Sequence, residues 1–176
     1  MADRFPGHIK LGGTITIETV EERIMVEAAL SAFAEWCSPS YGEPEFGDIP
    51  LADVAEHLNE EGYLHGKHDQ ARYGQFEEVE DACRMAGIGY IRHSSARYEY
   101  DAEIVEWRPG MESPFEQIAD ENGNTNVPGS TVETAITLIE EGRASEVAEM
   151  LKQALGQHVP ALEPLVIIDN APPEEE

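Results

Sequence analysis

The chain has 176 residues, and its 36 acidic side chains against 11 Lys and Arg give a formal net charge of −25, while 41% of the residues are hydrophobic. That apolar content exceeds what a disordered polyanion shows, and the length allows a core without disulfides or metal ions. The charge argues against direct binding to DNA, RNA or an anionic membrane, because phosphate contacts need Lys and Arg.

The N-terminal part predicts an extended segment followed by a long helix. Residues 8–17 alternate around a Gly-Gly pair, which indicates a bulged strand or a tight hairpin. Thr19 and Glu22 have the spacing of a capping box, and the apolar spacing behind them predicts a helix over 20–36. Residues 37–50 are rich in Pro and Gly and predict a loop.

The middle of the chain predicts two short helices and a group of strands. The apolar spacing favours helices over 51–58 and 76–83, the second ending before Gly87, with a short strand at 63–69 between them. The alternating patterns that follow predict a β-meander with strands at 88–93, 96–100 and 103–108.

Pro, Gly and Asn clusters predict a linker over residues 109–130. Ser130 and Glu133 suggest a second capping box, in front of two helices separated by a break at Gly142. These last elements are helices at 132–139 and 147–155 and a short inserted strand at 165–168.

This order of elements predicts an α+β fold with helices packed on a mainly antiparallel sheet and a central β-meander. We expect one domain over residues 1–170, with any break into sub-units within 109–130, and a disordered acidic tail at 171–176. Cys37 and Cys83 lack a CxxC spacing, and the N-terminus has no apolar leader. We therefore expect a reduced, cytoplasmic protein.

One acidic and aromatic segment is the candidate surface for binding a partner. Aromatic side chains supply contact area and carboxylates pair with Arg and Lys of a basic protein. The candidate residues are Tyr98, Glu99, Tyr100, Asp101, Glu103, Glu106 and Trp107. The alternative is a two-faced strand that packs its Tyr side chains inward and exposes its acids. A second acidic patch, Glu77, Glu78, Glu80 and Asp81, is interpreted as the solvated face of a helix.

The sequence contains no G-x-S-x-G, no phosphate-binding loop and no dinucleotide fingerprint, so no catalytic residue and no cofactor are predicted. The most metal-like string holds His65, His68 and Asp69, since imidazoles beside a carboxylate suit zinc. A small metal-dependent enzyme built on these three residues is the alternative function.

The first hypothesis is a non-enzymatic acidic protein that engages a basic protein partner, and in its sharper form occupies the DNA- or RNA-binding site of a nucleic-acid-binding protein. By charge and size alone the chain is similar to small acidic inhibitors of the anti-restriction and anti-CRISPR type. Salt adaptation is the rival explanation of the charge. We expect a salt-adapted surface to be rich in Asp, whereas this chain has 28 Glu and only 8 Asp, so salt adaptation explains the charge less well.

Overall fold

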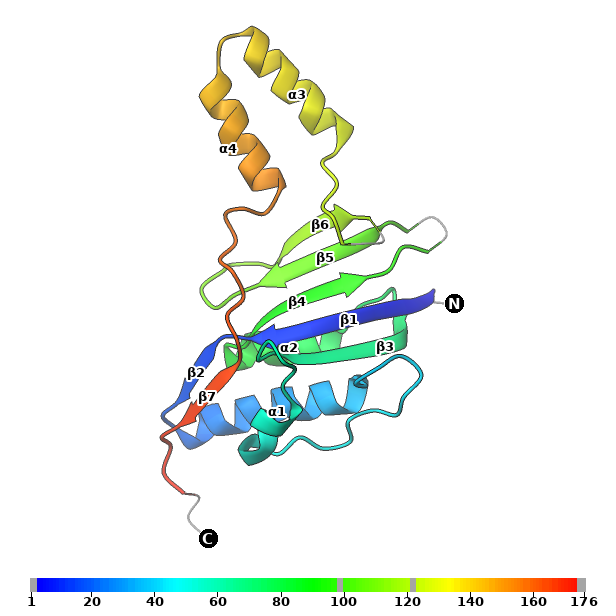
Figure 1. Ribbon diagram of the computed structural model, residues 1–176. Helices are drawn as coiled ribbons and strands as arrows, with labels where there is room; N and C mark the ends of the chain where they lie inside the picture. Colours follow the sequence, from blue (N-terminus) through cyan, green and yellow to red (C-terminus); the bar gives the residue numbers. More distant parts are fainter. Residues whose placement is uncertain (1–2, 98–99, 121–122, 174–176) are drawn as a thin grey trace.

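The computed structural model describes residues 3–97, 100–120 and 123–173, and its centre is a five-stranded antiparallel sheet (Figure 1). The strands lie in the order β3 (Leu64–Arg72), β1 (Arg4–Gly12), β4 (Gly89–Ser94), β5 (Ala102–Trp107) and β6 (Phe115–Ala119). Every pair of neighbours is antiparallel. The α+β class, with helices on a mainly antiparallel sheet, is confirmed.

Two helices cover one side of this sheet, here called the helix side. Helix α1 (Val20–Trp36) begins at the predicted capping box, where the Thr19 hydroxyl accepts from the Glu22 amide and the Glu22 carboxylate accepts from the Thr19 amide. Helix α2 (Glu77–Ala86) ends at Gly87, whose φ of 71° is left-handed. The buried core between helices and sheet includes Leu30, Phe33, Val79 and Cys83 from the helices and Ile9, Leu11 and Tyr90 from the strands.

The chain leaves the main sheet at Gly13, whose φ is 104°. Beyond it, β2 (Thr14–Ile17) pairs in parallel with β7 (Val166–Asp169), so these two strands form a separate sheet. Of the two alternatives predicted for 8–17, the tight hairpin is therefore wrong, because β1 and β2 do not pair with each other, and the strand expected at 165–168 is not inserted in the main sheet. Burial of Ile15 and Ile17 explains the bend, because it turns β2 toward the core.

The central meander consists of β4, β5 and β6, which differs from the prediction. No strand forms at 96–100 within the described residues. Arg97 and Tyr100 instead form an isolated antiparallel bridge with two backbone hydrogen bonds of 2.9 Å, and residues 98–99 lie outside the described part. The third strand, β6, comes from inside the predicted linker 109–130 and pairs with β5. Whether residues 96–100 and 115–119 form a strand thus depended on whether a neighbouring strand pairs with them.

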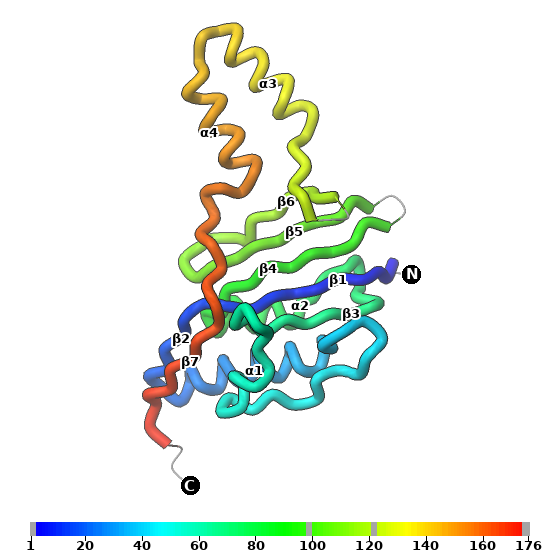
Figure 2. Tube along the Cα trace, in the orientation of Figure 1, coloured from blue at the N-terminus to red at the C-terminus, as the bar shows by residue number. Residues whose placement is uncertain are grey.

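Helices α3 (Gly129–Glu140) and α4 (Ala144–Ala154) form a hairpin around Gly142, whose φ is 76°. The break at Gly142 is as predicted, but the second capping box is not, because α3 begins after Pro128 and has no side-chain cap. The hairpin projects away from the sheet beyond β6 (Figures 1 and 2).

From α4 the chain returns across the open side of the sheet, which is the side opposite the helices (Figure 2). The Tyr63 hydroxyl donates to the Leu162 carbonyl at 2.8 Å, and the Gly13 amide donates to the Glu163 carbonyl at 2.8 Å. The η1 helix (Leu51–His57) is a short 3₁₀ turn beside α1. Within the described ranges, no helix has the length and apolar character needed to cross a membrane.

The predicted acidic tail lies partly outside the described residues, at 174–176. Its first residues are held by α1: the Arg23 guanidinium donates to the carbonyls of Ala171 and Pro172 at 2.9 Å. The same guanidinium forms an ion pair with Asp169, at 2.8 Å from Nε to Oδ2. Ala171 and Pro172 are thus bound to α1.

Candidate protein-binding groove

The predicted binding residues do not share one face of β5. Glu103 lies opposite Ser94 and Trp107 lies opposite Tyr90, so both point to the helix side. Glu106 lies opposite Ile91 and points to the open side. Because side chains alternate along a strand, residues three positions apart face opposite ways. Tyr98 and Glu99 lie outside the described residues.

Three of the predicted residues are used inside the fold. Trp107 is 7% exposed and stacks on Tyr90 with ring centroids 6.2 Å apart. Glu103 accepts from Arg92 at 2.6 Å, and Glu106 accepts from Arg108 at 2.8 Å. The two carboxylates are therefore already neutralised by buried guanidinium groups, and Trp107 contributes to the core.

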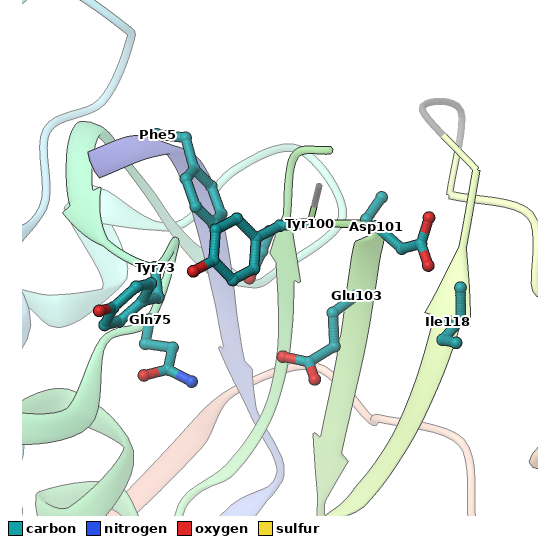
Figure 3. A pocket seen from close by; sticks show the side chains of 9 residues that line it. Phe5, Tyr73, Gln75, Tyr100, Asp101, Glu103 and Ile118 are labelled. Carbon is teal, nitrogen blue, oxygen red and sulfur yellow. The ribbon is translucent and has the colours of Figure 1, made fainter. Parts of the chain in front are cut away.

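Tyr100, Asp101 and Glu103 line a hollow of about 500 Å³ at the end of the sheet on the helix side. Figure 3 shows these residues around it, together with Phe5 from β1, Tyr73 and Gln75 from the turn after β3, and Ile118 from β6. The Tyr100 ring centroid lies 5.9 Å from that of Phe5 and 5.8 Å from that of Tyr73. Tyr100 is 37% and Ile118 is 46% exposed. The hollow therefore has an aromatic and apolar lining at its mouth.

A second hollow, of about 340 Å³, adjoins the first at Gln75. It lies between α2 and β6, over the buried side chain of Val105 on β5. We call the two hollows together the acidic groove. Six carboxylates and two guanidinium groups line it: Glu77, Glu80, Asp81, Asp101, Glu103 and Glu116, with Arg84 and Arg92.

The acids of the groove fall into a paired and an unpaired set. Arg84 forms an ion pair with Asp81, and Arg92 forms ion pairs with Glu80 and Glu103. Glu77, Asp101 and Glu116 are exposed and form no ion pair with another described residue. These three carboxylates are therefore available to a cation from outside.

The acidic patch on α2 is only partly a solvated helix face. Glu80 is 8% exposed, and its Oε1 lies 2.9 Å from Arg92 Nε and accepts from the Phe76 amide at 3.1 Å. A sequence pattern alone could not distinguish Glu80 from the exposed Glu77 and Glu78 beside it. The buried cation that pairs with Glu80 is Arg92, which lies on β4 and not on α2.

Tyr73, at the edge of the groove, has a φ of 54°, the left-handed region that bulky side chains rarely adopt. The Gly74 amide closes the turn by donating to the Ala71 carbonyl at 3.1 Å, and the Tyr73 amide donates to the Asp3 carbonyl at 2.9 Å. Unusual backbone conformations of this kind occur preferentially at functional sites. Tyr73 was missed at the sequence level, where only the Gly that follows it signals a turn.

The proposed metal ligands are separated by the strand that carries them. His65 lies opposite Lys10 on the open side, whereas His68 lies opposite Gly7 on the helix side and its ring is 6.2 Å from that of Trp36. The Asp69 carboxylate accepts from the Gly42 amide at 2.8 Å. Across the described part of the chain, no group of three or more His, Cys, Asp or Glu side chains could hold a metal ion.

A row of three imidazoles crosses the open side of the sheet. The His8 ring lies 5.3 Å from that of His65 and 5.0 Å from that of His93. Burial, and then the neighbouring His93 and His65, lower the pKa of His8 to about 4. Burial also lowers the pKa of His65. His8 and His65 therefore favour the neutral form at pH 7.

Both cysteines are buried in the core, and Cys37 lies at the start of the predicted loop, directly after α1. Burial raises the pKa of each thiol. Buried thiols of this kind are unreactive at neutral pH.

Comparisons with protein-family models, with curated proteins and with solved structures found no match.

Proposed function

We propose that the protein is a non-enzymatic binding protein whose acidic groove takes a basic segment of a protein partner. The observation that carries the proposal is the combination of exposed Glu77, Asp101 and Glu116 with the aromatic lining from Tyr73 and Tyr100. Carboxylates pair with Arg and Lys, while aromatic faces attract the same cations. The net charge of −25 adds long-range attraction for a basic surface.

In the sharper form of this proposal, the partner is a nucleic-acid-binding protein. The acidic groove then binds the basic residues of the partner that normally contact the phosphates of DNA or RNA. The Arg and Lys side chains of such a site are solvated and spaced to receive anions. Binding would then be competitive with DNA or RNA, with fast association that weakens as salt increases.

The test compares two variants with the same change in net charge. Asp101→Lys with Glu116→Lys alters the groove, and Glu21→Lys with Glu27→Lys alters exposed positions on α1. Wild-type and variant proteins are immobilised and incubated with nuclease-treated native lysate, and captured proteins are identified by mass spectrometry. Affinities for the purified partner are then measured.

We expect the groove variant to lose roughly 2–5 kcal/mol of binding free energy and the α1 variant to lose much less. Equal losses in both variants would show that bulk charge alone drives binding. Release of the partner by added duplex DNA or RNA would support the sharper form, and simultaneous binding of partner and nucleic acid would contradict it.

A further inference from the structure

An arginine cluster borders one end of the acidic groove. Arg4 begins β1, Arg72 ends β3 and Arg97 follows β4. The Arg97 guanidinium donates to the Arg4 carbonyl at 2.6 Å. The guanidinium carbon of Arg72 lies 5.7 Å from the ring centroid of Tyr73, which lines the first hollow (Figure 3). We call Arg4, Arg72 and Arg97 the arginine rim.

The arginine rim gives this end of the sheet an excess of positive charge among the described residues. Arg4 and Arg72 lie directly opposite each other in the β1–β3 pair, and both side chains are exposed. Neither forms an ion pair with another described residue, although the chain has 36 acidic residues and Asp3 precedes Arg4. Like charges directly opposite each other destabilise a sheet, so an anion bound beside both arginines would stabilise this end.

The far end of the acidic groove has the opposite charge. Glu77 and Glu116 line the second hollow, are exposed and form no ion pair with any residue in the described ranges. Glu116 lies opposite Val105 on β5, three residues from Ala102 at the first hollow, which is about 10 Å along an extended strand. The groove therefore runs from unpaired carboxylates, past the Tyr73 ring, to the arginine rim.

From this polarity we infer that the acidic groove binds a protein segment of mixed charge in one orientation. Basic residues of the segment pair with Glu77 and Glu116, and an acidic residue about four positions away in the extended segment pairs with the arginine rim. Arg and carboxylate groups form bidentate hydrogen bonds, which makes the second contact specific. The inference rests on the proposed function and adds to it the requirement for an acidic residue in the partner.

The arginine rim disfavours two other kinds of ligand. A segment with only basic residues would bring a cation against Arg72, and like charges across an interface cost affinity. A nucleic acid strand would provide an anion for the rim, but its next phosphates would lie against Glu77 and Glu116, in the field of a chain with a net charge of −25. A segment of mixed charge matches both ends of the groove.

The test uses two capped, fluorescently labelled peptides: Arg-Arg-Gly-Ser-Gly-Glu-Glu, the mixed peptide, and Arg-Arg-Gly-Ser-Gly-Arg-Arg, the basic peptide. Fluorescence anisotropy measures their affinities for the full chain. We expect Arg4→Gln with Arg72→Gln, the rim variant, to bind the mixed peptide about fivefold more weakly, because two exposed ion pairs are lost. The rim variant should bind the basic peptide more tightly than the wild type does, because a repulsion is removed.

Two further variants separate the arginine rim from bulk charge. Arg143→Gln with Lys152→Gln, on the α3–α4 hairpin, makes the same change in net charge as the rim variant. This control should change the affinities of both peptides in the same direction, and by less than the rim variant does. Glu77→Gln with Glu116→Gln, the carboxylate variant, should weaken the binding of both peptides.

The outcomes distinguish the inference from the proposed function. If the carboxylate variant weakens both peptides but the rim variant strengthens both, the inference is overturned while the proposed function stands. If neither peptide binds the wild type, or if the carboxylate variant binds both peptides as the wild type does, both are overturned. Binding of a single-stranded RNA or DNA oligonucleotide that the rim variant loses would identify the anion as a nucleic acid and overturn the inference.

A second measurement determines the orientation of the bound mixed peptide. A spin label at the acidic end of the peptide should broaden the amide resonances of Tyr73 and Gly74 in NMR spectra of the full chain. A spin label at the basic end should broaden the resonances of Glu77 and Glu116 instead. The reverse pattern, or equal broadening from both labels, would contradict a single orientation set by the arginine rim.

Discussion

Arg92 Nε lies 2.9 Å from Glu80 Oε1, and the same guanidinium binds Glu103 at 2.6 Å. Arg92 is on β4, Glu80 is on α2 and Glu103 is on β5, so one buried cation joins the α2 wall of the acidic groove to the two strands of its floor. Arg92 also donates to the Ser94 hydroxyl. The α2 wall is therefore held to the sheet without a covalent cross-link.

Replacing Arg92 with Met should destabilise the protein by about 3–5 kcal/mol, because Glu80 would be left buried without a counter-charge. Urea unfolding measures this free energy. Arg143→Met is the control, since the ion pairs of Arg143 with Glu141 and Glu146 are exposed and should contribute little to stability. Adding Glu80→Gln to Arg92→Met should recover part of the loss. No recovery would mean that the charge of Glu80 is not the cause.

Gly66 allows β3 to pass directly beneath α1. A Cβ at this position would lie 2.4 Å from Cys37 Cβ and 2.6 Å from the Phe33 ring. Gly66→Ala should therefore destabilise the fold by about 3 kcal/mol or more, since the core would have to move. Gly129→Ala, with no atom within 4 Å of its added Cβ, should leave stability unchanged or raise it slightly. Similar thermal midpoints for both variants would contradict the close approach.

Tyr73→Gly should cost less than about 1 kcal/mol of stability, because the lost ring contacts are offset by relief of the left-handed backbone. Tyr63→Gly removes a half-buried Tyr without positive φ and should cost roughly 3 kcal/mol. Affinity for the basic partner should fall for Tyr73→Gly. Unchanged affinity would remove Tyr73 from the binding surface.

His8 should make stability depend on pH. The pKa of His8 is lowered to about 4 in the folded protein, so the unfolded chain binds this proton more readily. The contribution of His8 to the free energy of unfolding is complete above the unfolded pKa of about 6.5, and it is lost as the pH falls toward 4. The groups that face it are His93, His65, Lys67 and Lys10.

His8→Asn should remove about 2 kcal/mol of the pH dependence of unfolding between pH 6.5 and 4. The difference between wild type and variant isolates this residue from the many carboxylates that also titrate. His57→Asn, on η1, serves as the control. Parallel curves for wild type and His8→Asn would show that the imidazole row has no such effect.

The sequence predicted best those features that depend on neighbours within one turn. The Thr19–Glu22 capping box, the end of α2 at Gly87 and the break at Gly142 all formed as expected. Each depends on a local hydrogen bond or on a left-handed residue, and both leave a signal in consecutive residues. The α+β class followed from the order of these elements.

Strand partners were decided only in the tertiary structure. Residues 115–119 become β6 because they pair with β5, although Pro and Gly surround them, and β2 pairs with β7 about 150 residues away along the chain. Long-range pairing of this kind leaves no local pattern, because the hydrogen-bonding groups are the same in every residue.

In the candidate site, too, the sequence predicted the local features and the tertiary structure determined the long-range ones. From the sequence alone, Tyr100, Asp101 and Glu103 could be selected by composition and local pattern. The register of β5 against β4 then turned Glu106 to the open side and buried Trp107 on the helix side. The fold brought Tyr73, Glu77 and Glu116 from three other segments to the same groove. The buried Arg92 and Arg108 pair with Glu80, Glu103 and Glu106, so these carboxylates are not free to bind a partner. The sequence could not predict this, because the burial of an Arg side chain depends on how the whole chain packs.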